Sequence, residues 1–243
     1  MRRFFIAVIF LLSLPAVRAE VPALLQAAYD RLAADVDHWA YTQTAVSRDG
    51  KGKVKDETVV RYDPSQPFDV QWTPLKIDGK EPTARQVKKY RHERDKNRDK
   101  RRTLGELLNL EKAVAAEETP TAVTYEVPLI KDDEQRFPPE KFRVLIRVRR
   151  EQPVLEHIAV KLRDSLRAAL IVKVISGEAA LEFSPVDPKF APPITAIHGG
   201  GTGSVFFVKV GATFDVTRTD FKRVKPYNDR FQVKIGPMKT IDF

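Results

Sequence analysis

The segment His198-Gly199-Gly200-Gly201 is similar in sequence to part of a hydrolytic active site. In lipases and esterases a loop of this kind donates backbone N–H groups to an oxyanion, and a serine in a Gly-x-Ser-x-Gly turn is the nucleophile. No serine of this chain has that context, and the glycines do not form a Gly-x-x-x-x-Gly-Lys-Ser/Thr phosphate loop. We therefore interpret the glycine run as a flexible hairpin or lid, and a hydrolase that uses His198 is a third alternative.

Residues that bind metals are few and scattered. The histidines at positions 38, 92, 157 and 198 form no His-x-x-x-His pair, and the chain has no cysteine. Without cysteine, a zinc ribbon, a disulfide-stapled miniprotein and a thiol enzyme are excluded. The acidic residues alone do not define the paired carboxylates of a glycosidase. We expect a non-enzymatic protein with no catalytic residue, no metal site and no cofactor.

A basic run from Arg85 to Arg102 contains ten Lys or Arg residues and three acids. On a helix only Val87 and Tyr90 would share an apolar face, so this helix is mostly solvated. It is either a plain solvated helix or a docking element for anionic lipid head groups or an acidic envelope protein. Nucleic acid is not expected, because Tyr90 is the only aromatic residue within the run. The docking candidates are Lys88, Lys89, Arg91, Arg94, Arg98 and Arg101.

The first 19 residues have the pattern of a secretory signal peptide. Arg2 and Arg3 precede an apolar run that ends at Leu14, and small residues lead to a cleavage site after Ala19. We expect export to the periplasm, because the chain has no cysteine and no later apolar run long enough to span a bilayer. Residues 20–243 then form a single domain.

The elements that must position these residues begin with an amphipathic helix. Apolar residues recur every three or four positions from Val21 to Trp39, which predicts about five helical turns. Strands follow over 41–46 and 54–62, with Asp49-Gly50 as the hairpin turn between them, and another strand runs through Val70 and Trp72.

A helical insertion is predicted over about 83–112. Thr83 with Gln86 forms a capping box that opens a helix through the basic run, and Thr103 with Glu106 restarts a shorter one.

From about residue 122 the chain returns to strands. Apolar residues at every second position of 142–148 and 158–162 predict half-exposed antiparallel strands. The remaining strand candidates are 170–175, 179–183, 205–210, 212–218 and 231–235. The prolines and glycines of 185–203 predict a long mobile loop.

Nine or ten strands that follow one another predict an antiparallel meander. The predicted fold class is therefore α+β: a large curved antiparallel sheet, or half-barrel, with the N-terminal helix and the helical insertion packed on its concave side. If these helices cover the sheet incompletely, an apolar cavity remains. Its candidate lining residues are the large aromatics Trp39, Tyr41, Trp72, Phe142, Phe206, Phe214 and Phe231.

Several short motifs resemble those of the periplasmic lipoprotein carriers of the LolA/LolB/RseB type. These are the signal peptide, the opening helix Val21 to Val36, the stretch Trp39-Ala40-Tyr41-Thr42-Gln43, Asp49-Gly50, and Trp72-Thr73-Pro74-Leu75 followed by Asp78-Gly79-Lys80-Glu81-Pro82-Thr83. The resemblance implies a half-barrel whose apolar cavity takes acyl chains. The basic insertion departs from the carrier pattern.

Two functions remain open besides the hydrolase that would use His198. The first is a non-enzymatic periplasmic binding or carrier protein for a lipid, a lipoprotein or another hydrophobic envelope component. The alternative is a cell-envelope protein-interaction module with a filled sheet scaffold and a basic docking helix. A vacant apolar cavity would favour the first function, and a face packed solid by aromatic side chains would favour the second.

Overall fold

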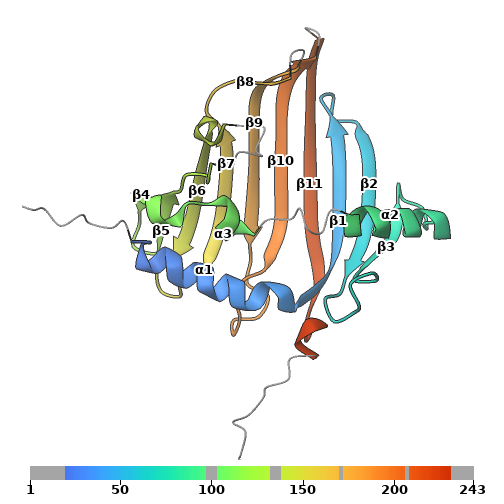
Figure 1. The fold of residues 1–243 in the computed structure, drawn as a ribbon, viewed down its shortest axis with the longest axis horizontal. Coiled ribbons are helices and arrows are strands. Elements are labelled where there is room, and N and C mark those ends of the chain that lie inside the picture. The colour runs from blue at the N-terminus through green and yellow to red at the C-terminus, as the bar shows by residue number, and fades with distance from the viewer. Residues whose placement is uncertain (1–19, 97–102, 132–137, 170–171, 206–207, 231–243) are drawn as a thin grey trace, which may run out of the picture.

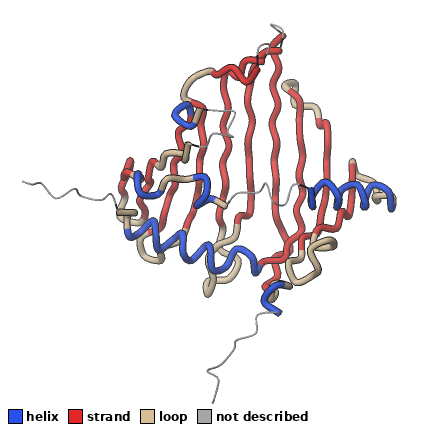
Figure 2. The backbone as a smooth tube through the Cα atoms, in the orientation of Figure 1, coloured by secondary structure: helices blue, strands red, loops and turns tan. Residues whose placement is uncertain are grey.

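The computed structural model describes residues 20–96, 103–131, 138–169, 172–205 and 208–230. Within these ranges the fold is one large antiparallel sheet with an N-terminal helix, as the sequence predicts, but the sheet has eleven strands rather than nine or ten (Figures 1 and 2). The helices are α1 (Ala23–Asp35), α2 (Ala84–Lys96) and α3 (Leu104–Leu107). The strands are β1 (Trp39–Asp49), β2 (Val54–Tyr62), β3 (Trp72–Ile77), β4 (Val114–Glu118), β5 (Ala122–Glu126), β6 (Phe142–Arg149), β7 (Leu155–Leu162), β8 (Leu166–Ala169), β9 (Val172–Phe183), β10 (Ile194–Val205) and β11 (Val208–Arg223).

The sheet joins two meanders rather than forming a single one. The strand order is β3-β2-β1-β11-β10-β9-β7-β6-β5-β4, and β8 pairs with β9. The first strand therefore pairs with the last, from Trp39 opposite Arg223 to Asp49 opposite Ala212. Because β3 and β4 are consecutive in the chain but lie at opposite edges, the helical insertion leads from one edge of the sheet to the other.

Helix α1 covers the strands around β6 and β7. Its buried residues Leu25, Ala28 and Leu32 lie on one stripe, as the three- and four-residue spacing predicts. They pack against the inward side chains of β6 and β7, of which Ile146 and Ile158 are fully buried. In β6 the buried positions alternate with exposed or half-buried ones, so the predicted period of two is confirmed.

The first helix ends earlier than predicted. Its α-helical part stops at Asp35, a 3-10 turn follows over Val36–His38, and Trp39 is the first residue of β1. The reason is tertiary: the indole of Trp39 is only 3% exposed and packs edge-on against Phe190 and Phe221.

The prediction of a long mobile loop over 185–203 is wrong for its second half. Residues Ile194–Val205 form β10, which is paired along its length with β9 and β11. The glycines fit this strand because its neighbours leave little room for side chains. A Cβ atom on Gly199 would lie 2.5 Å from the ring of Phe214, and one on Gly201 would lie 2.7 Å from the carbonyl oxygen of Ser176.

Other strand boundaries also differ. The two strands predicted over 170–183 are one strand, β9, and the strand predicted over 205–210 spans the end of β10 and the start of β11. The predicted strand 231–235 lies outside the described residues.

The helical insertion forms as predicted at both of its capping boxes. Gln86 accepts a hydrogen bond from the backbone N–H of Thr83 at 2.8 Å, and Thr103 and Glu106 cap α3 reciprocally. α3 packs on the core through Leu104 and Leu107, whereas α2 lies against the edge strand β3. No helix of the described ranges is long and apolar enough to cross a membrane.

Candidate functional site

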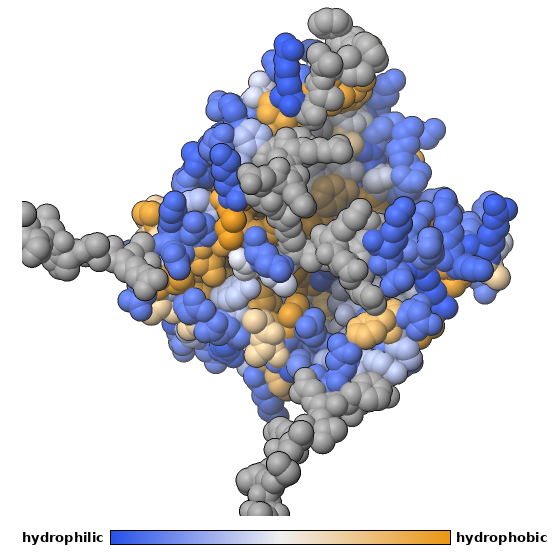
Figure 3. Space-filling model, viewed as in Figure 1, coloured by the Kyte–Doolittle hydropathy of each residue, from blue (hydrophilic) through white to orange (hydrophobic). Residues whose placement is uncertain are grey.

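The two faces of the sheet differ in chemistry. We call the face that carries α1 the helix face and the other the open face. Ile158 pairs with Leu181, and Leu181 pairs with Ile197, so all three project to the helix face. Figure 3 shows apolar residues gathered over the middle of the sheet on this face. Strand alternation then places Ala179 and Phe214 on the helix face as well.

The aromatic candidates on β1 and β3 pack on one another, and Trp72 also lines a small groove of about 190 Å³ beside α2. Trp39, Tyr41 and Trp72 belong to one cluster with Tyr62 and Phe221. Ring centroids of Tyr62 and Trp72 lie 4.5 Å apart, and those of Tyr41 and Tyr62 lie 5.0 Å apart. Trp39 and Tyr41 are only 3% and 8% exposed, so these two residues are corrected from cavity lining to core, whereas Trp72 is half-buried.

An apolar hollow of about 580 Å³ lies further along the helix face. Phe142, Val160 and Phe214 contribute its large side chains. Phe214 is 42% exposed although its ring lies directly over Gly199. Two of the seven predicted lining residues are thus brought together, while Phe206 and Phe231 lie outside the described residues.

Small residues create this hollow. Gly177 pairs with Gly201, Gly201 pairs with Ala212, and Ala179 pairs with Val160, so the floor is formed largely by glycine and alanine. The packed core under α1 reaches Leu181 on β9, just beyond this floor. These small residues were not among the predicted lining residues, although they recur at every second position of 177–179 and 199–201 in the sequence.

One cation lies on the helix face between the aromatic cluster and the hollow. Arg218 pairs with Gln43 in the sheet and donates a hydrogen bond from Nε to the Gln43 amide oxygen at 3.2 Å. Its guanidinium carbon lies 4.5 Å from the centre of the Tyr41 ring. Within the described part of the chain, no carboxylate forms an ion pair with Arg218. Because Phe214 is four residues away on the same strand, the two Cα atoms are roughly 13 Å apart.

The predicted docking residues on α2 differ in their surroundings, because some contact β3 and others are exposed. Arg91 donates to the Thr73 hydroxyl at 3.2 Å, and the Arg94 guanidinium lies 4.3 Å from the centre of the Trp72 ring, so both hold α2 against β3. Lys88 and Lys89 are exposed, and Lys89 lies 3.8 Å from Glu93. Arg98 and Arg101 lie outside the described residues. A docking role of α2 stays a prediction.

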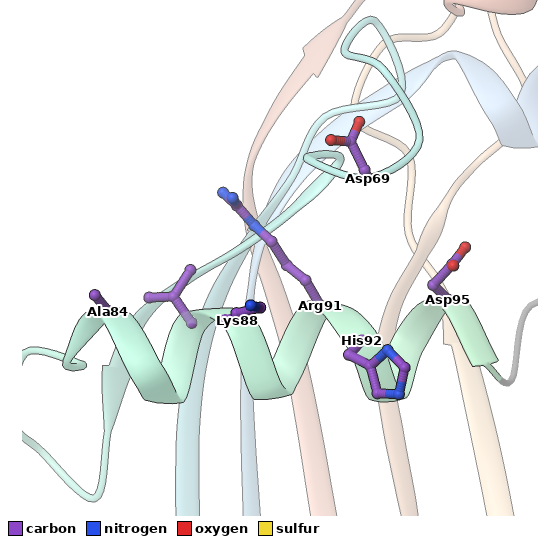
Figure 4. A pocket seen from close by; sticks show the side chains of 7 residues that line it. Asp69, Ala84, Lys88, Arg91, His92 and Asp95 are labelled. Carbon is purple, nitrogen blue, oxygen red and sulfur yellow. The ribbon is translucent and has the colours of Figure 1, made fainter.

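The groove beside α2 carries both signs of charge. It has a volume of about 470 Å³ and is lined by Asp69 and Asp95 as well as by Lys88, Arg91 and His92. Figure 4 shows Asp69, Asp95 and Arg91 on the side of α2 that faces the 63–71 loop, with His92 on the other side. This mixture makes the groove a poor match for a purely anionic surface.

The open face carries ion pairs between strands. His198 Nδ1 lies 2.9 Å from Asp215, which also pairs with Arg48. The hydrogen bond from His198, with the Arg48 charge in support, outweighs desolvation and lowers the pKa of Asp215. Nearby, His157 Nε2 lies 3.3 Å from Glu182. In the described ranges no hydroxyl hydrogen-bonds to His198, so the pair has no serine or threonine partner there for acyl transfer.

A metal centre is not apparent in the described residues either, where no three His, Asp or Glu side chains gather as ligands.

No protein-family model matches the chain, and no curated protein matches it. The resemblance to the lipoprotein carriers, the signal peptide and the periplasmic location therefore stay predictions.

Proposed function

We propose that this protein is a non-enzymatic binding or carrier protein of the cell envelope that takes the acyl chain of a lipid or lipoprotein. The observation that carries the proposal is the apolar hollow on the helix face. Its volume of about 580 Å³ lies within the range of roughly 300–1,000 Å³ that is typical of small-molecule sites. In this proposal the sheet acts as a half-barrel, and the exported chain begins after residue 19.

Chemistry of the lining supports an alkyl chain rather than a polar ligand. Phe142, Val160 and Phe214 offer apolar surface, and the glycines and alanines of the floor leave space beside it. Removing apolar surface from water contributes about 25 cal/mol per Å². A bound chain would therefore also cover the partly exposed ring of Phe214.

A second candidate function is the protein-interaction module. The observation in its favour is that Trp39 and Tyr41, which were expected to line a cavity, are buried in a cluster of aromatic rings. The two functions make opposite predictions for the hollow, because only a carrier requires it to be vacant.

The test is to fill the hollow. We expect Ala179→Phe/Ala212→Phe to weaken binding of a dansylated long-chain fatty acid at least about tenfold, because the two phenylalanine side chains would occupy the space of the ligand. The matched control is Ala159→Phe/Ala180→Phe, which adds the same bulk to the open face. Binding is measured by fluorescence titration, and thermal unfolding verifies that both variants fold.

Two results would count against the proposal. One is unchanged fatty-acid binding in the filled variant. The other is a purified wild-type protein that carries no lipid by mass spectrometry of its organic extract and binds no acyl probe.

A further inference from the structure

The end of the sheet that lies furthest from α1 has an unusual surface composition. β10 and β11 extend beyond the ends of β1 and β2 there (Figures 1 and 2). We call the described residues of 165–176 and 202–210 the tip. In sequence these two segments contain three cations, Arg167, Lys173 and Lys209, and no acidic residue.

Three apolar side chains of the tip are exposed, whereas Leu166 is buried. Val208 is 65% exposed, and Val210 and Ile175 are each 47% exposed. Val208 and Val210 alternate with Lys209 on β11, so both valines project to the helix face. On this face they continue the line of Ala212 and Phe214, which leads to the apolar hollow.

The cations of the tip form a row on the opposite side. Arg167 pairs with Lys173, Lys173 pairs with Ser204, and Ser204 pairs with Lys209. The row therefore crosses four strands, with Ser204 between Lys173 and Lys209. All three are exposed. No ion pair to a carboxylate is found for any of them within the described ranges.

We propose that the tip docks on an anionic phospholipid bilayer. Val208, Val210 and Ile175 would enter the boundary between head groups and acyl chains, while Arg167, Lys173 and Lys209 contact lipid phosphates. Exposed apolar residues beside cations are the combination that holds proteins at membrane interfaces. A three-cation row without acids complements a negative surface, unlike the groove beside α2, which contains Asp69 and Asp95.

This docking surface goes beyond ligand binding and does not depend on it. If both proposals hold, the apolar line from Val208 to Phe214 gives an acyl chain a path between the bilayer and the hollow. If the hollow binds no ligand, the tip still binds vesicles. The hollow-filling variant Ala179→Phe/Ala212→Phe should therefore keep its vesicle binding, and tip variants should keep fatty-acid binding in solution.

The experiment is co-sedimentation of the purified protein with vesicles of phosphatidylcholine containing phosphatidylglycerol. We expect Val208→Asp/Val210→Asp to lower vesicle binding at least about tenfold. The matched control is Val114→Asp, because Val114 is 66% exposed, as Val208 is 65% exposed, yet lies outside the tip, on the edge strand β4. This control should bind vesicles as the wild type does.

Charge reversal separates the cationic contribution from the apolar one. Lys173→Glu/Lys209→Glu should lose about tenfold or more in binding to the anionic vesicles, because each cation near such a surface contributes roughly fivefold. Lys88→Glu/Lys89→Glu on α2 is the control and should change binding little.

Three outcomes would overturn the proposal. The first is a wild-type protein that does not sediment with anionic vesicles, as expected if the tip contacts a protein instead. The others are unchanged vesicle binding in both tip variants, and a loss of binding in the Val114 or α2 control that equals the loss in the tip variants. Circular dichroism verifies that each variant is folded.

Discussion

Gly177 and Gly201 face each other across β9 and β10 but do not have the same space around them. A Cβ atom on Gly177 would find its nearest neighbour, the Gly200 carbonyl oxygen, at 3.9 Å, which is ordinary contact. On Gly201 it would lie 2.7 Å from the Ser176 carbonyl oxygen, so backbone must shift. We expect Gly201→Ala to lower the free energy of unfolding by about 1–3 kcal/mol. Gly177→Ala should be neutral or stabilising by up to about 1 kcal/mol.

Urea unfolding of the two variants provides the measurement. Since both substitutions add the same methyl group to the same sheet, each serves as the control of the other. Equal destabilisation would contradict the packing described for β10 and would indicate that the glycines matter only through backbone entropy.

If the hollow takes acyl chains, we expect Arg218 to bind the acidic head group of the amphiphile. It is a half-buried cation that stacks on Tyr41 and has no carboxylate partner in the described residues, so an acidic head group can approach it. A hydrogen bond to a charged group contributes about 1.5–3 kcal/mol. We expect Arg218→Gln to weaken palmitate binding about tenfold and to leave binding of methyl palmitate unchanged.

The ester provides the internal control, because it has the same alkyl chain without the negative charge. Competition against the dansylated fatty acid measures both affinities. Equal losses for the acid and the ester would show that Arg218 acts through the packing of Tyr41 rather than through charge.

At the scale of elements, local patterns predicted the helices and the strands that pack against them. In β6 and β7 the alternation of apolar residues decides which face is buried, and the structure has Val144, Ile146 and Ile158 there as core. The capping boxes at Thr83 and Thr103 were equally predictable, because the partners lie three residues apart. These signals are local, so no knowledge of the sheet was needed.

The glycine-rich strand could not be predicted in this way. A run of glycines has low strand propensity, and its assignment to β10 depends on what lies on the neighbouring strands. The ring of Phe214 over Gly199 and the Ser176 carbonyl beside Gly201 are both contacts between residues distant in sequence. The same limit applies to Trp39, whose place in β1 is fixed by Phe190 and Phe221.

Prediction of the candidate site had a similar limit. The size of an aromatic side chain is visible in the sequence, but its neighbours are not. Trp39 and Tyr41 were therefore expected to line a cavity, although both are buried against other rings. A hollow requires small residues opposite one another on several strands. Only the register of β9, β10 and β11 brings Gly177, Gly201 and Ala212 together.

At the scale of the whole molecule, the packing is uneven. Buried side chains are concentrated where α1 covers β5, β6 and β7. Among the described residues of β10 and β11, only Gly203 is buried. Stability need not be uniform across one sheet, because regions with few buried contacts open locally at a lower free energy than the core.

The rates of amide hydrogen exchange should therefore differ between strands of the sheet. We expect amides of β6 and β7 to exchange at least about 100-fold more slowly than those of β11 from Val208 to Phe214, since the core opens only by global unfolding. Addition of palmitate should slow exchange at 177–179 and 212–214 and leave β6 unchanged. Uniform protection across the sheet would contradict the uneven packing. Uneven protection that does not respond to palmitate would agree with the described packing but count against the ligand site. The same measurement therefore tests the architecture and the proposed function separately.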